Sequence, residues 1–285
     1  RLVYINDKIV NRDKAAVSAF DRGLLYGYGL FETMRSYGGA VFRLDRHLNR
    51  LTRSAEAIGL APALDVPQLA FAVAQTLDAN GIADARIRLT VTAGQGGRAL
   101  SLPASGPLTV MIAVEELALP SPDVYSKGLS ACIVSIRRNS GSPLSRMKTI
   151  GFMDNILARD EASRKGADEA ILLNERGRVV ECSTSNIFIV ESGGLVTPPL
   201  DSGILSGVTR EAVIELASQI GIEVKEETVA IERLLLADEV FITNSIIELM
   251  PVVSIDGRAV GAGGPGEMTR RLMSAYRELA VAGLR

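Results

Sequence analysis

Histidine and cysteine are nearly absent from this sequence of 285 residues. His47 is the only histidine, and Cys132 and Cys182 are the only cysteines. This scarcity argues against a zinc site with several histidines and against a histidine-based catalytic triad. Two cysteines are also too few for a disulfide framework. We therefore expect two buried thiols in a reducing compartment such as the cytoplasm.

The sequence also lacks an excess of charge and a long apolar run. Its 31 basic and 33 acidic residues give a net charge of −2. This balance gives no electrostatic reason to expect a nucleic-acid or anionic membrane partner. No apolar run approaches the roughly 20 residues that a membrane helix needs, and no signal peptide is visible. We expect a cytoplasmic protein that binds neither nucleic acid nor membrane.

The composition, 47% hydrophobic and 22% charged, is typical of a folded globular protein with a sizeable core. Residues 119–128, LPSPDVYSKG, hold two prolines and a glycine, which favours a domain boundary there. We therefore predict an N-terminal domain at 1–118, a linker at 119–128 and a C-terminal domain at 129–285.

Short strands outnumber helices and are arranged largely in hairpins. Helical periodicity predicts helices at 45–59, 66–79, 150–165, 209–220 and 267–280. In the first of these, Asp45 is the predicted N-cap. The pattern predicts an α+β fold with mainly antiparallel sheets rather than a doubly wound parallel sheet.

Three features in the second half of the chain have groups suited to catalysis or ligand binding. Lys148 opens a predicted helix in an otherwise apolar stretch, where burial frees a lysine amine to attack a carbonyl. Glu181 ends a predicted strand, where its carboxylate could pair with a protonated ring nitrogen. Leu205-Ser206-Gly207-Val208-Thr209-Arg210 opens the clearest helix, whose free N–H groups attract anions.

An amine, a carboxylate and an anion cradle together suit pyridoxal 5'-phosphate, which has an aldehyde, a ring nitrogen and a phosphate. Taken singly, each feature also fits a structural interpretation. Lys148 fits a surface lysine, Glu181 an exposed residue at a strand end, and the turn a plain helix cap. Thr243-Asn244-Ser245 could add hydrogen bonds to the phosphate, or could form a polar turn.

The glycine-rich stretch 21–32, DRGLLYGYGLFE, has two interpretations that spacing alone leaves equal. It fits a loop with turn glycines, or backbone that must lie close to a ligand. In the second case Tyr26, Tyr28 and Phe31 would form walls of the site, and Phe31 would contact substrate.

The whole chain resembles the fold type IV pyridoxal-phosphate enzymes. These include branched-chain aminotransferases, D-amino acid aminotransferases and 4-amino-4-deoxychorismate lyases. The separation of 33 residues between Lys148 and Glu181 also fits this family. The matching segments are 20–33, 42–51, 147–149, 168–188, 197–199, 203–210, 237–241 and 243–252.

The resemblance implies a role for each matching residue. Lys148 would form the Schiff base with the cofactor and carry the proton, and Glu181 would hold the ring nitrogen. The phosphate would be bound by Arg50, Val208, Thr209 and Ser245.

The resemblance also implies a smaller N-terminal α/β domain, a larger C-terminal domain of mixed strands, and a cofactor between them in a homodimer. We thus expect Lys148 and Glu181 to be adjacent in space. Several relatives carry a tyrosine shortly after the lysine, whereas this chain has Phe152, which cannot donate a hydrogen bond to the cofactor hydroxyl.

The sequence constrains the type of reaction less than it constrains the identity of the cofactor. Segments 94–98, 135–139 and 243–245 most resemble the lyases, which release pyruvate and 4-aminobenzoate, a folate precursor. Arg98 could pair with a substrate carboxylate, although D-amino acid aminotransferases also carry an arginine there. Ala99 and Leu100 depart from the glycine and tyrosine common in lyases. We expect a lyase, with an aminotransferase of D-amino acid or branched-chain type as the alternative. A non-enzymatic scaffold would have lost Lys148 or Glu181, and both are present.

Overall fold

The computed structural model describes residues 1–60, 64–96, 102 and 106–282, which fall into two compact units. The first contains Arg1–Ala118, Met147–Gly151 and the C-terminal residues from Ala280, and the second contains Leu119–Arg146 and Phe152–Leu279. Residues 119–128, predicted to be a linker, belong to the second unit. The division into folding domains at 1–118 and 129–285, with a linker between them, stays a prediction.

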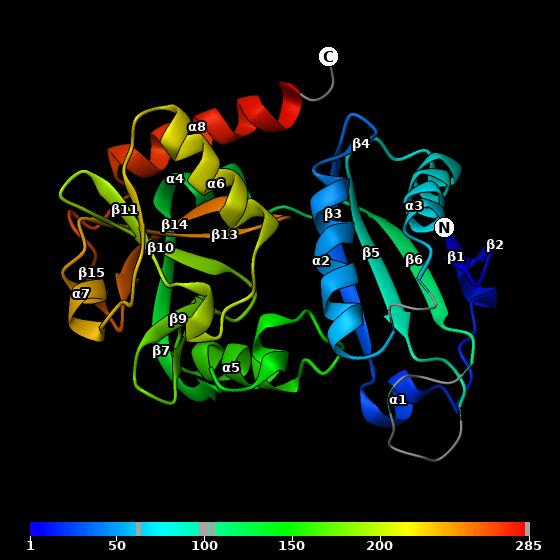
Figure 1. The fold of residues 1–285 in the computed structure, drawn as a ribbon. Helices are drawn as coiled ribbons and strands as arrows, with labels where there is room; N and C mark the ends of the chain where they lie inside the picture. Colours follow the sequence, from blue (N-terminus) through cyan, green and yellow to red (C-terminus); the bar gives the residue numbers. More distant parts are fainter. Residues whose placement is uncertain (61–63, 97–101, 103–105, 283–285) are drawn as a thin grey trace. The chain divides into compact units, whose positions relative to one another are not determined.

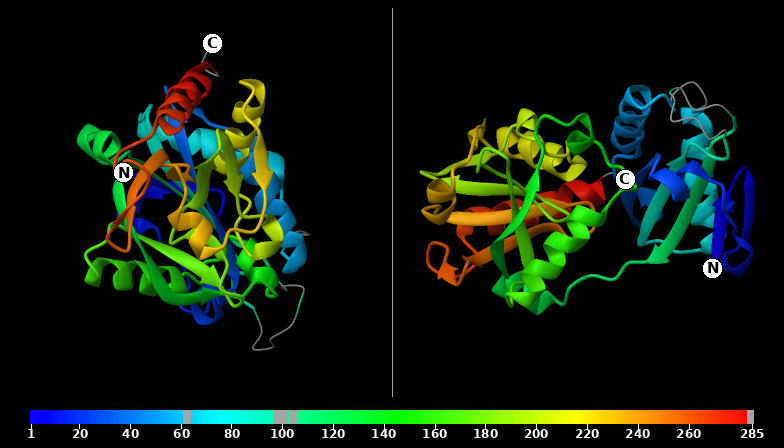
Figure 2. Two further views of the ribbon diagram at one scale, coloured as in Figure 1. Left: turned by 90° about the vertical axis from the view of Figure 1, so that its left-hand side faces the viewer. Right: turned by 90° about the horizontal axis from the view of Figure 1, so that it is seen from below.

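The first unit contains an antiparallel sheet of six strands among the described residues, in the order β2-β1-β6-β5-β3-β4. Figures 1 and 2 show β1 and β2 at one edge of this sheet. The strands are β1 (Leu2–Ile5), β2 (Lys8–Asn11), β3 (Gly29–Tyr37), β4 (Ala40–Val41), β5 (Ala85–Thr92) and β6 (Thr109–Glu116). The helices are α1 (Arg22–Tyr26), α2 (Leu44–Ala57) and α3 (Val66–Asn80).

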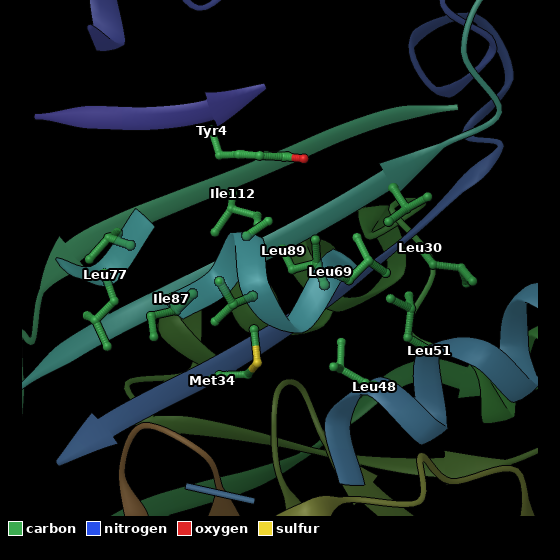
Figure 3. Close-up of a cluster of buried hydrophobic side chains, with 14 of the residues drawn as sticks. Tyr4, Leu30, Met34, Leu48, Leu51, Leu69, Leu77, Ile87, Leu89 and Ile112 are labelled. Atoms are coloured by element: carbon green, nitrogen blue, oxygen red, sulfur yellow. The ribbon is translucent and has the colours of Figure 1, made fainter. Parts of the chain in front are cut away.

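The core of the first unit forms between α2, α3 and one face of this sheet. Alternate strand residues such as Leu30, Met34 and Leu89 meet Leu48 of α2 and Leu69 of α3 (Figure 3). Side chains alternate between the two faces of a strand, so the residues between these core positions lie on the opposite face. That opposite face carries Phe31 and Arg88, which matter below.

The caps of the first unit's helices explain one error in the predicted boundaries. Asp65 accepts a hydrogen bond from the Gln68 amide and begins α3, and Gly81 ends it in the left-handed conformation. The predicted N-cap Asp45 is wrong, because α2 already begins at Leu44 after Arg43. Asp45 instead lies in the first turn, where its charge still favours the helix dipole.

The second unit contains a mixed sheet of nine strands among the described residues. The order is β12-β11-β10-β13-β14-β7-β8-β9, with β15 paired to β14 off this path. A further pairing of β10 with β9 closes the last six strands of this order into a ring. The strands are β7 (Leu129–Arg138), β8 (Glu169–Asn174), β9 (Val179–Cys182), β10 (Asn186–Glu191), β11 (Gly194–Thr197), β12 (Val224–Glu226), β13 (Glu239–Asn244), β14 (Glu248–Ile255) and β15 (Arg258–Ala259).

The second unit also contains α-helices that follow or precede these strands. They are α4 (Pro122–Lys127), α5 (Met153–Arg164), α6 (Val208–Gln219), α7 (Ile231–Leu235) and α8 (Glu267–Ala282). Glu239 of β13 accepts hydrogen bonds from the amides of Met268 and Thr269, which fixes the start of α8 on the sheet. Phe188 and Phe241 stack in parallel at 4.9 Å between adjacent strands β10 and β13.

The predicted α+β fold with a C-terminal mixed-strand domain is confirmed by this architecture and by the structural relatives reported below. The preference for antiparallel pairing holds throughout the first unit, whereas β7 pairs in parallel with both β8 and β14. Cys132 and Cys182 are buried free thiols, as predicted. Within the described part of the chain, no helix has the length and apolar character required to span a membrane.

Candidate active site

Lys148 lies in an extended segment beside β3 of the first unit. The Phe31 amide donates to the Lys148 carbonyl at 2.9 Å, and the Ile150 amide donates to the Gly29 carbonyl at 3.1 Å. The prediction that Lys148 opens a helix is wrong, because α5 begins only at Met153. Gly29 permits the close approach on this strand, since a Cβ there would lie 3.0 Å from Ile150 Cδ1 and 2.7 Å from the Val91 carbonyl oxygen of β5.

The side chains of Lys148 and Arg88 both approach the buried ring of Phe31. The Lys148 Nζ lies 4.4 Å and the Arg88 Cζ lies 3.8 Å from the ring centroid. The two cations are therefore no further apart than the sum of these distances, about 8.2 Å. Phe31 thus lies beside the Lys148 amine, and its contact with substrate stays a prediction.

Arg88 is a cation that sequence reasoning did not select. Its neighbour Arg86 forms an ion pair with Glu115 at 2.9 Å, whereas Arg88 faces Ala113 across the strands. Among the described residues Arg88 has no hydrogen-bonded or ion-paired partner. Burial, together with the nearby charge of Arg86, lowers the pKa of Arg88. The alternation of Arg86, Arg88 and Thr90 along β5 was the signal that could have identified it.

Arg50 belongs to a buried polar network that joins α2 to β3. Its Nε and Nη2 donate to the two carboxylate oxygens of Glu32, at 2.9 and 2.5 Å. His47 Nδ1 lies 2.8 Å from the same carboxylate. Burial alone raises the pKa of Glu32, but the charge of Arg50 and the hydrogen bonds from both neighbours outweigh it and lower the pKa to about 2. Arg50 is thus held rigidly in the first unit.

Glu181 lies on β9 of the second unit and is buried, contrary to the interpretation as an exposed strand end. The register of β8 with β9 is irregular at this point, which is typical of strands that redirect a side chain. One carboxylate oxygen lies 2.6 Å from an Arg138 nitrogen, and the other accepts from the Leu205 amide at 3.0 Å. Asn186 Nδ2 lies 3.4 Å from this second oxygen.

The start of α6 provides an anion cradle close to Glu181. Gly207 precedes the helix and gives no side-chain cap, so its first amides keep their donor capacity. Thr209 is buried in the first turn. A Cβ on Gly207 would lie 2.0 Å from Asn186 Oδ1, so only glycine allows this close approach.

The end of β13 adds hydroxyl groups in the same region of the second unit. Thr243 pairs across the strands with Asn186, which itself pairs with Glu181, so the three side chains form one row. The Thr243 hydroxyl is buried without a partner among the described residues. Ser245 follows this strand and is half-buried. The donors of an uncapped helix start and an unpaired hydroxyl, together with the acceptor oxygens of a buried carboxylate, fit a ligand with a phosphate and a ring nitrogen.

The remaining predicted positions are placed less fully. Arg98 lies outside the described residues, as do Ala99 and Leu100. Phe152 immediately precedes α5. Lys148 belongs to the first unit and Glu181 to the second, so their adjacency in space stays a prediction.

Comparison with known proteins assigns these residues to a family. The profile of amino-transferase class IV matches residues 29–255. A protein of Methanocaldococcus jannaschii, provisionally named a branched-chain-amino-acid aminotransferase, is 40% identical over 97% of this chain and 96% of its own length. The aminodeoxychorismate lyase of Bacillus subtilis is 34% identical over 97% of this chain and 94% of its own length.

Solved structures agree with this assignment. The branched-chain amino acid aminotransferase of Escherichia coli superimposes with a TM-score of 0.92 at 32% identity, over 98% of this chain and 94% of that one. The branched-chain amino acid aminotransferase of Thermobaculum terrenum, solved in its PLP-form, gives a TM-score of 0.88 at 30% identity, over 99% and 94%. The chain belongs to the class IV aminotransferase family and is a pyridoxal-phosphate-dependent enzyme.

Proposed function

We propose that this enzyme is an aminotransferase that exchanges the amino group of a branched-chain amino acid with a 2-oxo acid. The observation that carries this proposal is the likeness of the whole chain to branched-chain aminotransferases in sequence and in structure. It favours the alternative expected from the sequence over the lyase. The lyase is kept as the second candidate because the Bacillus subtilis enzyme is 34% identical.

The first unit supplies the amine and one cation for the phosphate. Lys148 Nζ attaches the cofactor and moves the proton at the substrate α-carbon, a role that needs an amine against an apolar wall such as Phe31. Arg50, with its orientation fixed by Glu32, binds phosphate. When bound, pyridoxal 5'-phosphate supplies a carbonyl for amine exchange and a ring that accepts electrons.

The second unit supplies the acid and the helix terminus. Glu181 would hold a proton at the ring nitrogen, and Arg138 pairs with this buried carboxylate at 2.6 Å. The amides of Val208 and Thr209, with the Ser245 hydroxyl, bind phosphate oxygens at the start of α6. The unpaired Thr243 hydroxyl supports a polar ligand beside Glu181.

The substrate interacts with the outer face of the first unit's sheet. Arg88 offers a guanidinium within about 8.2 Å of the Lys148 amine, a separation that an amino acid carboxylate can bridge. Phe31, Ala113 and Met111 lie on the same face as Arg88 and offer apolar surface for a branched side chain. We therefore assign to Arg88 the binding of the substrate carboxylate. The same role for Arg98, suggested by the sequence, stays a prediction.

A substrate panel tests the proposed reaction. L-leucine with 2-oxoglutarate should give glutamate, and omission of the acceptor should stop the reaction after one turnover. D-alanine with the same acceptor tests the D-amino acid type. Release of an aromatic amine from aminodeoxychorismate without acceptor would establish the lyase and reject the aminotransferase.

A homodimer in the cytoplasm is the proposed working form. Exposed apolar side chains cluster around α1, where Phe20 is 72% and Leu24 is 70% exposed, and such patches are typical of subunit contacts. Light scattering of the purified protein should give twice the mass of one chain. Leu24→Asp should shift it toward monomer, whereas Leu236→Asp, at an 83% exposed position of the second unit, should not. Cell fractionation tests the location.

A further inference from the structure

The buried network of Glu32, His47 and Arg50 has no explanation in packing alone. All three side chains are at least 94% buried. Burying charged groups opposes folding unless they are fully paired, and apolar residues of similar size often stabilise a core equally well. A network of this kind therefore needs a reason beyond the stability of the first unit.

The geometry of the network fixes the plane of the Arg50 guanidinium. Glu32 takes Nε and Nη2 in a two-point contact and leaves Nη1 out of that contact. A fork of this type sets orientation as well as distance. Because Glu32 starts from β3 and Arg50 from α2, the contact also transfers the rigidity of the sheet to the arginine.

His47 fixes the carboxylate from a second side. Glu32 is ionised and can only accept, so His47 Nδ1 must carry the proton in the 2.8 Å contact. Burial, followed by the charges of Arg50 and Lys148, lowers the pKa of His47, although the contact with Glu32 raises it. His47 therefore stays neutral near pH 7 and acts as a donor of fixed direction.

We propose that Glu32 and His47 are positioning residues that hold Arg50 in the one orientation in which it binds the cofactor phosphate. This inference rests on the proposed role of Arg50. It predicts the opposite of what electrostatic attraction alone predicts for phosphate binding. Removing the Glu32 carboxylate leaves the first unit more positive, which by attraction alone would strengthen binding of a phosphate. If orientation dominates, the same change weakens it.

The experiment measures binding to the apo protein rather than turnover. The dissociation constant of pyridoxal 5'-phosphate is obtained by absorbance titration, and inorganic phosphate is used as a competitor that reports the phosphate subsite alone. Glu32→Gln should weaken binding of both by about 10- to 100-fold, the range typical of residues that orient a ligand-binding group. His47→Asn should weaken both in the same direction but less. Glu116→Gln, which removes an exposed carboxylate of the same unit, should change neither.

A double-mutant cycle separates positioning from general damage to the fold. Arg50→Lys cannot form the two-point contact, and Glu32→Gln added to Arg50→Lys should cost little further affinity. Equal losses from Glu32→Gln in both backgrounds, or tighter phosphate binding by Glu32→Gln, would overturn the inference. If Arg50→Lys leaves both affinities unchanged, the proposed role of Arg50 itself fails. If Glu32→Gln does not fold, the same cycle is run with His47→Asn.

Discussion

Arg138 and Glu181 form an ion pair of 2.6 Å in the interior of the second unit. The pair joins the long strand β7 to the short strand β9, two strands that do not pair directly. Since the carboxylate also accepts the Leu205 amide, both of its oxygens are occupied by donors. The Glu181 carboxylate is thus held in place beside the residues that lead into α6.

Glu181→Gln is expected to keep the cofactor bound but to slow proton removal from the substrate. The loss of a preorganised charge should cost about 3 kcal/mol of barrier, or roughly 10²-fold in rate. Single-turnover kinetics with excess enzyme measure this step. Arg138 would lose its buried partner, so thermal unfolding should also shift downward. Wild-type rates in this variant would remove the proposed role of Glu181.

Lys148→Ala is expected to abolish both turnover and the absorption band of the Schiff base near the violet edge of the visible spectrum. Turnover should fall by about 10³-fold or more, since a positioned proton carrier is lost with the amine. Lys127→Ala, at an exposed lysine paired with Asp123, serves as the control and should retain both properties. Full activity of Lys148→Ala would refute the mechanism. If Lys148→Ala and Glu181→Gln both change the spectrum of the same bound cofactor, the predicted adjacency of the two residues is supported.

Arg88→Gln is expected to lower kcat/KM for amino acid and 2-oxo acid by about 10- to 100-fold, because a charged hydrogen bond contributes roughly 1.5–3 kcal/mol. Most of the loss should be in KM, since the carboxylate is held throughout the reaction. The matched control is Arg86→Gln, on the same face of β5 but paired with Glu115. A larger loss in Arg86→Gln than in Arg88→Gln would reverse the assignment of the substrate cation.

Acidification is expected to destabilise the first unit through Glu32 and His47. The pKa of Glu32 is lowered to about 2 from 4.5, so its stabilisation is complete above pH 4.5 and is lost as the pH falls toward 2. Its size is on the order of 3 kcal/mol. The pKa of His47 is lowered from 6.5, so below pH 6.5 the unfolded chain binds a proton at this residue more readily than the folded protein does. The free energy of unfolding therefore falls as the pH drops below 6.5 toward the lowered pKa.

Thermal unfolding midpoints of the apo protein between pH 7.5 and 3 check this expectation. Glu32→Gln should flatten the curve below pH 4.5, and His47→Asn should flatten its upper part. A stability curve of unchanged slope in both variants would show that other groups control the acid response.

Gly207→Ala is expected to weaken cofactor binding and to lower stability by about 1–3 kcal/mol, the usual effect of overpacking. The added methyl group would have to displace the Asn186 amide, which hydrogen-bonds the Leu205 carbonyl. Gly264→Ala is the control, because no atom lies within 4 Å of a Cβ at that position. Cofactor titration and thermal unfolding of both variants are compared, and equal behaviour would argue against a tight cradle.

Residue chemistry and local spacing were enough to propose several residues of the candidate site. An amine, a carboxylate and a glycine turn before an amphipathic helix pointed to Lys148, Glu181 and the start of α6. The helix 209–220 was predicted almost to the residue, as α6 runs from Val208 to Gln219. Its apolar positions recur at helical spacing, and a glycine precedes it, so the local signals agreed.

The missed features depend on contacts between distant segments. Lys148 was predicted at a helix start because Ile150–Lys165 has helical composition, yet residues 148–150 pair with β3, more than 100 positions earlier. Arg88 was overlooked because its distinguishing feature is the residue opposite it on β6, which is Ala113 rather than a carboxylate. The irregular register at Glu181 likewise arises from pairing of β8 with β9 and leaves no trace in the spacing of either strand.

The pairing of β9 with β10, which closes the ring, limits where substitutions can accumulate as this enzyme evolves. The register that completes the ring pairs Asn186 with Glu181, whose carboxylate is proposed to bind the ring nitrogen of the cofactor. A slip of this backbone pairing would therefore misplace the acid. Ring closure and the proposed chemistry therefore share one residue, so variation in substrate preference is easier to accommodate on the face of the first unit's sheet that carries Arg88.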